Sequence, residues 1–256
     1  KPISGSSLRV IFDGDDSSHE LLCLAKNNNG HKNLMRAISK AHNNYLYQTP
    51  ILNFNDLEEL RNDVIVISGG KDSHLFELIK RKKIDEAANR IDKFLGVFQE
   101  DFFIEIQKTN RPDEQEFLTN ILPISNSKGV PLIATNDVLF SEKNDYEIHE
   151  TKVCINTGRT LNDPNREKPF SSEQYFKSPE EMSNLFVDFD ELIKNTNEVS
   201  KKCNVSLHTE GYFLPEYPVP DEHDFDSYIA ELSHKKLNKI IVNFEDKKKE
   251  EYKQRL

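Results

Sequence analysis

The sequence contains few cysteines, and their number and spacing argue against a small protein held together by disulfides or by zinc. Cys23, Cys154 and Cys203 are an odd number of thiols spread over 256 residues. This arrangement fits neither a disulfide framework nor a zinc cluster. It favours reduced thiols and a cytosolic, cytoplasmic protein.

Long apolar segments and an excess of positive charge are also missing. No run approaches the roughly 20 apolar residues that a membrane-spanning helix needs, and no signal peptide is recognisable. The net charge is −10, which repels phosphate backbones, so we expect this segment neither to bind nucleic acid by itself nor to contact a membrane. An acidic surface suits a basic protein partner or a metal-binding mouth, and it is also common among soluble proteins.

The familiar catalytic motifs are absent as well. There is no Gly-x-Ser-x-Gly and no His-x-His pair. His149-Glu150 lacks the second histidine of a zinc-protease motif, which favours a structural histidine. Ser68-Gly69-Gly70 lacks the remainder of a phosphate-binding loop and instead predicts a tight turn between a strand and a helix.

The two ends of the sequence indicate a piece of a longer chain. It opens at Lys1 without a methionine, and a charged helical run at 245–251 reaches Leu256 without a Gly or Pro terminator. We therefore expect both ends to be boundaries within a larger protein.

Apolar runs alternate with helical patterns over the first 140 residues. Strands alternating with helices of this length predict a parallel sheet or a barrel, whose chemistry lies on the loops that follow the strands. The predicted strands are 8–12, 21–25, 64–67, 102–106 and 131–135. Helices are predicted to start near His31, after the cap Asn55, and near Ser73, Ile84 and Pro112. The first of these helices would place Leu34, Met35, Ile38 and Ala41 on one face.

The pattern changes after about residue 140. A capping box at Ser178, followed by Pro179, predicts the start of a helix. The other predicted helices are 145–157, 189–203 and one starting near Asp226, with a long loop at 158–177 and a linker at 211–224.

Two carboxylates stand out within this scaffold. Asp137 follows a strand. A carboxylate at this position is compatible with three roles: metal ligand, base or ordinary loop residue. Glu105 lies in the middle of a strand and points opposite to Ile104 and Ile106. A charge aimed into a barrel must be paired, and we expect an Arg or Lys partner rather than a metal.

Several motifs, in their order and spacing, resemble those of one family over nearly the whole chain. They are Lys1–Gly5, 24–34, 67–70, 111–114, 134–138, and Asn204-Val205 with 212–215. By these motifs the chain resembles the PHP (polymerase and histidinol phosphatase) domain of the alpha subunit of bacterial DNA polymerase III. The resemblance implies an α/β fold, a distorted seven-stranded β/α barrel that is incomplete at its N-terminal strands and followed by a helical segment.

The resemblance also implies a domain division. Residues 1–205 would be the PHP domain lacking its first strands, and 206–256 a linker and first helix leading into the polymerase body. Without its first strands a barrel has an open edge, so we expect an open sheet.

Active members of this family bind divalent metals at the barrel mouth, and their ligand positions can be carried over one by one. They fall on Ser7, Glu20, Gly70, Asp137 and Leu139, of which only Asp137 is retained, although Glu20 can ligate and His19 is one residue away. One or two ligands cannot hold a multinuclear cluster. The resemblance therefore implies a degenerate site with no metal, cofactor or catalytic residue, made up of Ser7, His19, Glu20, Gly70, Glu105, Asn136, Asp137 and Leu139.

The function implied by the resemblance is a scaffold that docks the proofreading exonuclease subunit. Other DNA polymerase III holoenzyme subunits are further expected partners. The parent protein would be a DNA-directed DNA polymerase, a nucleotidyltransferase that contacts DNA and uses Mg outside this segment. The alternative is a residual metal-dependent phosphoesterase or 3′–5′ exonuclease using Asp137, Glu105, and Glu20 or His19. Apart from the resemblance, a plain α/β barrel of unknown function remains open.

Overall fold

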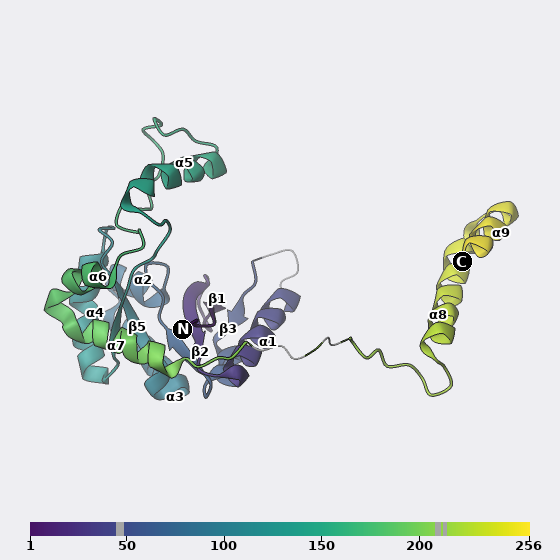
Figure 1. The fold of residues 1–256 in the computed structure, drawn as a ribbon, viewed down its shortest axis with the longest axis horizontal. Coiled ribbons are helices and arrows are strands. Elements are labelled where there is room, and N and C mark those ends of the chain that lie inside the picture. Colours follow the sequence, from purple (N-terminus) through teal and green to yellow (C-terminus); the bar gives the residue numbers. More distant parts are fainter. Residues whose placement is uncertain (45–48, 208–210, 212–213) are drawn as a thin grey trace. The chain divides into compact units, whose positions relative to one another are not determined.

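The computed structural model describes residues 1–44, 49–207, 211 and 214–256. The chain divides into two compact units, Lys1–Leu207 and His208–Leu256, and each is described by itself (Figure 1). Tyr212 and Phe213 of the family-like motif, and residues 208–210 beside them, lie outside the described residues. In the part of the chain that is described, no helix is long and apolar enough to cross a membrane.

A six-stranded mixed sheet forms the centre of the first unit. Within the described residues β3 and β6 are its free edges, so the sheet is open, as expected for an incomplete PHP-type barrel. The strands, in the spatial order β3-β1-β2-β4-β5-β6, are β1 (Gly5–Ile11), β2 (His19–Ala25), β3 (Leu52–Asn53), β4 (Val64–Ile67), β5 (Phe102–Gln107) and β6 (Leu132–Thr135).

The strand β2 departs from the parallel pairing that the alternation of strands and helices indicated. This strand pairs antiparallel with both β1 and β4, whereas β1–β3, β4–β5 and β5–β6 are parallel pairs. The reason is the short connection between β1 and β2, which forms a hairpin and leaves no room for the helical crossover that parallel neighbours need.

Helices cover both faces of this sheet, which explains why every residue of β4 is buried. Val64 and Val66 belong to the large core shared with α1 to α4, whereas Ile65 and Ile67 pack on the other face with Val199 of α7. The helices of the first unit are α1 (Asn28–Asn44), α2 (His74–Lys80), α3 (Ile84–Phe98), α4 (Glu114–Lys128), α5 (Tyr146–Thr157), α6 (Pro179–Leu185) and α7 (Asp190–Lys202).

α1 begins three residues earlier than predicted and buries a slightly different face. Leu34 and Ala41 are buried as expected, but Met35 is 49% exposed and Ala37 is buried instead. Position 35 lies about 100° around the helix from position 34, outside the stripe formed by residues three and four apart. Gly30 is required near its start, because a Cβ there would lie 2.1 Å from the Asp63 carbonyl oxygen.

Two predicted helix starts are shifted by side chains that bind the backbone just before the helix. The helix expected after Asn55 is a 3₁₀ helix, η1 (Phe54–Leu60), in which the Asp56 carboxylate accepts a hydrogen bond from the Asn53 amide. The helix expected at Pro112 starts at Glu114. The predicted capping box at Ser178 is confirmed.

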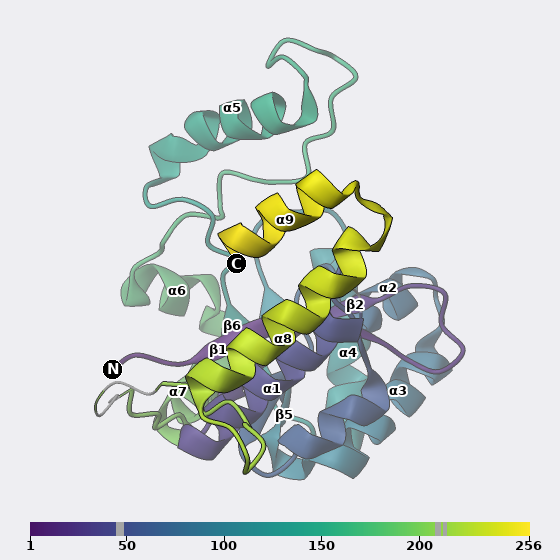
Figure 2. The ribbon, with the colours of Figure 1, turned by 90° about the vertical axis from the view of Figure 1, so that its right-hand side faces the viewer.

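The remaining elements are short 3₁₀ helices and the helices of the second unit. The helix expected near Asp226 begins at Phe225, and a further helix follows it (Figure 2). The second unit contains α8 (Phe225–Ile240), η5 (Ile241–Asn243) and α9 (Asp246–Arg255), and the other 3₁₀ helices are η2 (Gln99–Asp101), η3 (Lys143–Asp145) and η4 (Val187–Phe189).

Candidate functional site

Most of the predicted site residues line one cavity of about 320 Å³. It lies where β4, β5 and β6 end and where β2 begins, and we call it the mouth. Parallel strands bring their carboxyl ends to one edge of a sheet, which explains the convergence. The predicted residues that line the mouth are Ser7, Glu20, Gly70, Glu105, Asn136 and Asp137.

His19 and Leu139 do not line the mouth. Successive side chains of a strand point to opposite faces, so Glu20 faces the mouth and His19 the opposite side of the sheet. His19 therefore cannot substitute for Glu20 there. Leu139 is 38% exposed, and its amide donates to the Gln174 carbonyl, because the chain turns away after Asp137. His149 packs against Phe170 at a ring separation of 4.9 Å.

Arg111 is the principal site residue that the sequence analysis missed. Its side chain is only 6% exposed and lines the mouth. Nη1 donates to Asp137 Oδ2 at 3.0 Å, and Nη2 donates to Gln107 Oε1 at 2.5 Å. Nε donates to Thr109 Oγ1 at 2.8 Å and to Glu114 Oε1 at 3.2 Å. The signal in the sequence was the position of Arg111 four residues after the end of β5.

Glu114 holds Arg111 in this orientation. Its buried carboxylate accepts hydrogen bonds from the Thr109 amide at 2.7 Å and from the Thr109 hydroxyl at 2.5 Å. A longer bond of 3.4 Å comes from the Arg111 amide. These bonds fold residues 109–113 back onto the first turn of α4, which explains why that helix begins after Pro112.

The side chain of Gln107 fills the space beside Gly70. A Cβ at Gly70 would lie 2.4 Å from Gln107 Oε1, so a side chain at this ligand position of the family would displace the Gln107 amide from its bonds to Arg111 and Glu105. The preceding glycine, Gly69, has a φ of +81° and forms the predicted tight turn after β4.

Glu105 has neutral partners, contrary to the expected Arg or Lys. Gln107 Nε2 donates to Glu105 Oε1 at 2.8 Å, and the Thr135 hydroxyl donates to the same oxygen. Burial raises the pKa of Glu105, while these two hydrogen bonds oppose the rise. A carboxyl group that protonates readily needs no cationic neighbour, which explains the outcome.

Asp137 is held from two sides. Besides Arg111, the buried Gln174 donates from Nε2 to Asp137 Oδ2 at 2.8 Å. The neighbouring Asn136 donates from Nδ2 to the Tyr175 carbonyl at 2.7 Å. Both bonds tie the end of β6 to residues 174–175, which lie far away in the sequence.

The donor set of the mouth does not fit a multinuclear metal cluster. The described residues that line it include four carboxylates, Glu20, Asp72, Glu105 and Asp137, and neither His nor Cys is among them. Glu105 and Asp137 already accept hydrogen bonds, and the Arg111 guanidinium has no lone pair to offer a metal and repels cations.

Glu105→Gln is expected to change how stability depends on pH. Because burial raises the pKa of Glu105 above its unfolded value of 4.5, the folded state binds the proton more tightly. This contribution is fully present below pH 4.5 and is lost as pH rises through the raised pKa, by about 1.4 kcal/mol for each unit of the rise. The free energy of unfolding of the wild type should therefore fall relative to that of the variant between pH 4.5 and neutrality.

Urea unfolding of both proteins across this range measures the difference. Glu58→Gln at an exposed position is the matched control, and its difference from wild type should not follow the same course. A Glu105→Gln difference that is constant with pH would contradict the raised pKa.

Comparison with known proteins shows what the chain is similar to. A family model for the PHP domain matches residues 1–109. The whole chain is 35% identical to DNA polymerase III subunit alpha of Escherichia coli K12, of which the match covers 23%. Over 91% of the chain, the identity to DNA polymerase III subunit alpha of Pseudomonas fluorescens is 36%, covering 20% of that protein. The chain thus spans about a fifth to a quarter of the length of these relatives.

Proposed function

Because the chain carries a PHP domain and is similar throughout to DNA polymerase III alpha subunits, we propose that it serves as the PHP region of a replicative DNA polymerase. In this proposal the mouth binds no metal cluster and performs no hydrolysis. The region acts as a scaffold of the polymerase and as the docking site for the proofreading exonuclease subunit.

The observation that carries the metal-free proposal is the Arg111 side chain among the mouth carboxylates. It joins the loop after β5 to the end of β6 through Asp137, and it reaches Glu105 through the Gln107 amide. A fixed guanidinium thereby balances negative charge that divalent metals would otherwise balance. The mouth becomes a structural junction between strand ends.

The proposal assigns polymerisation to the rest of the parent protein. In the rest of the protein, Mg would assist nucleotidyl transfer, and DNA and the other holoenzyme subunits would be bound. The whole assembly would work in the cytoplasm. The net charge of −10 supports this division, because an acidic segment repels a phosphate backbone.

Docking is tested by mixing the chain with the separately purified exonuclease subunit of the same organism and following both by size-exclusion chromatography. We expect co-elution as a complex at physiological ionic strength. A repeat at high salt is the control, since attraction between net charges alone is screened there. Separate elution of the two proteins at physiological ionic strength would contradict the docking role.

One observation favours the alternative of a residual phosphoesterase: Glu20, Glu105 and Asp137 line the same cavity. That function requires hydrolysis of a nitrophenyl phosphate or a DNA 3′ end that depends on Mn²⁺ and is lost in Asp137→Asn. The scaffold proposal expects no such activity from the chain.

A further inference from the structure

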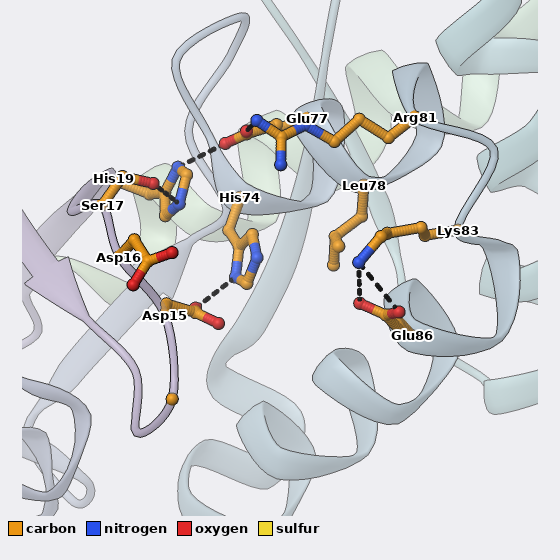
Figure 3. Close-up of a pocket in the computed structure, with 11 residues that line it drawn as sticks. Asp15, Asp16, Ser17, His19, His74, Glu77, Leu78, Arg81, Lys83 and Glu86 are labelled. Atoms are coloured by element: carbon orange, nitrogen blue, oxygen red, sulfur yellow. Dashed lines mark hydrogen bonds and ion pairs between the residues drawn. The ribbon is translucent and has the colours of Figure 1, made fainter.

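A second cavity, of about 360 Å³, contains a cluster of metal-ligating side chains that the mouth does not include. His19 comes from the first residue of β2, His74 from the first residue of α2, and Asp15 from the loop between β1 and β2 (Figure 3). Because His19 points away from the mouth, this cavity lies on the other face of the sheet. No role in the scaffold proposed above depends on these three residues.

The three side chains lie close enough to share one ion. One ligand atom from each of Asp15, His19 and His74 falls within 4.8 Å of the others. The two imidazole rings are stacked, with centroids 4.3 Å apart and an angle of 8° between their planes. Each histidine is only 7% exposed.

His74 supplies an independent sign that something is to be bound. Its Nδ1 atom is buried and has no hydrogen-bond partner. Asp15 Oδ2 lies 3.5 Å away, too far for a good hydrogen bond, and Figure 3 shows this nitrogen turned toward the Asp15 carboxylate. A buried nitrogen without a hydrogen bond costs free energy, and neither the stacking of the ring on His19 nor its tilted contact with Phe12 supplies that bond.

The charges around the cluster are mixed. Burial lowers the pKa of His74 to about 3 and also lowers that of His19. Glu77 Oε2 lies 3.4 Å from His19 Nδ1, whereas Arg90 donates to Asp15 Oδ2 at 3.2 Å. The remaining charged groups that line the cavity are Asp16, Glu86, Arg81 and Lys83.

We propose that Asp15, His19 and His74 form a binding site for one Zn²⁺ or a similar divalent transition-metal ion. Two imidazoles and a carboxylate are ligands that such ions prefer, and a water molecule would complete four-coordination. Ligand atoms bonded at 2.0–2.1 Å around a tetrahedral ion are roughly 3.3 Å apart, so the three groups must close by up to about 1.5 Å. The ion would fasten the β1–β2 hairpin to the start of α2.

Calorimetric titration of the chain with Zn²⁺ alone tests the site. We expect one ion per chain, with an affinity that falls at least roughly 100-fold in His74→Phe, since loss of a ligand exceeds the cost of losing a group that only supports one. His74→Phe keeps an aromatic ring in the stack. His234→Asn, which removes an exposed histidine of α8, is the matched control and should bind as the wild type does.

Two further variants make the outcome decisive. Asp15→Asn removes a carboxylate from a loop and should also weaken Zn²⁺ binding, so it tests the site if His74→Phe does not fold. Circular dichroism checks the folding of each variant. Glu105→Gln should leave the affinity unchanged, because it alters only the mouth. Absence of binding by the wild type, or affinities equal to wild type in both His74→Phe and Asp15→Asn, would overturn the proposal.

Discussion

Arg111→Met is expected to lower the free energy of unfolding by about 3–5 kcal/mol, the usual cost of removing one partner from a buried ion pair. The side chain of Glu114 is only 9% exposed, and it would lose the cation that balances its charge. Asp137 would lose the same partner, but its side chain is 38% exposed and water can compensate for part of that loss. Urea unfolding followed by circular dichroism measures the change in the transition of the first unit.

Arg159→Met is the matched control for this prediction. Arg159 also pairs with a carboxylate, Asp163, but its side chain is 56% exposed. Removing an exposed ion pair of this kind changes stability by at most about 1 kcal/mol. Equal, small effects of the two substitutions would show that the Arg111 network contributes little to the fold.

Phe94→Ala is expected to destabilise the chain by about 3–5 kcal/mol, because it opens a cavity in the large core. Phe94 is 1% exposed and stacks on Phe102, with ring centroids 4.5 Å apart. Its ring also meets Phe12 and Phe54 edge to face. These contacts join α3 to β5 and to the end of β1, so the loss should appear in the same unfolding transition.

Phe176→Ala provides the comparison for the core substitution. Phe176 is 74% exposed, and surface truncations usually stay within about 0.5 kcal/mol. The difference between the two phenylalanines should therefore be several kcal/mol. A Phe94→Ala chain that unfolds at the same urea concentration as Phe176→Ala would refute the assigned core.

Local patterns in the sequence predicted the helices of the first unit and its strands except the two-residue β3, because a buried run such as 64–67 or a capping box such as Ser178 is decided within a few residues. The antiparallel pairing of β2 was missed, although the short connection between β1 and β2 was visible. The same alternation that turned Glu105 inward would also have separated His19 from Glu20, since neighbouring strand residues face opposite sides.

The site itself was predictable in position but not in content. The motif that includes Asp137 located one side of the mouth. The network around Arg111, in contrast, depends on a contact with Asp137, which is 26 residues away in the sequence. Gln174 is 37 residues from the same carboxylate. Such contacts follow from how the loops fold back over the sheet, which no local pattern contains. The cluster of Asp15 with His74 was hidden for the same reason.

The central claim, that the mouth holds no metal cluster and that Arg111 is the partner of Asp137 there, is tested most directly by crystals of the chain grown with Mn²⁺. An anomalous difference map locates every bound manganese independently of activity. We predict no peak within coordination distance of Glu20, Glu105 or Asp137, with the Arg111 guanidinium hydrogen-bonded to Asp137. Two or three manganese ions bridging these carboxylates, with Arg111 displaced, would contradict the account.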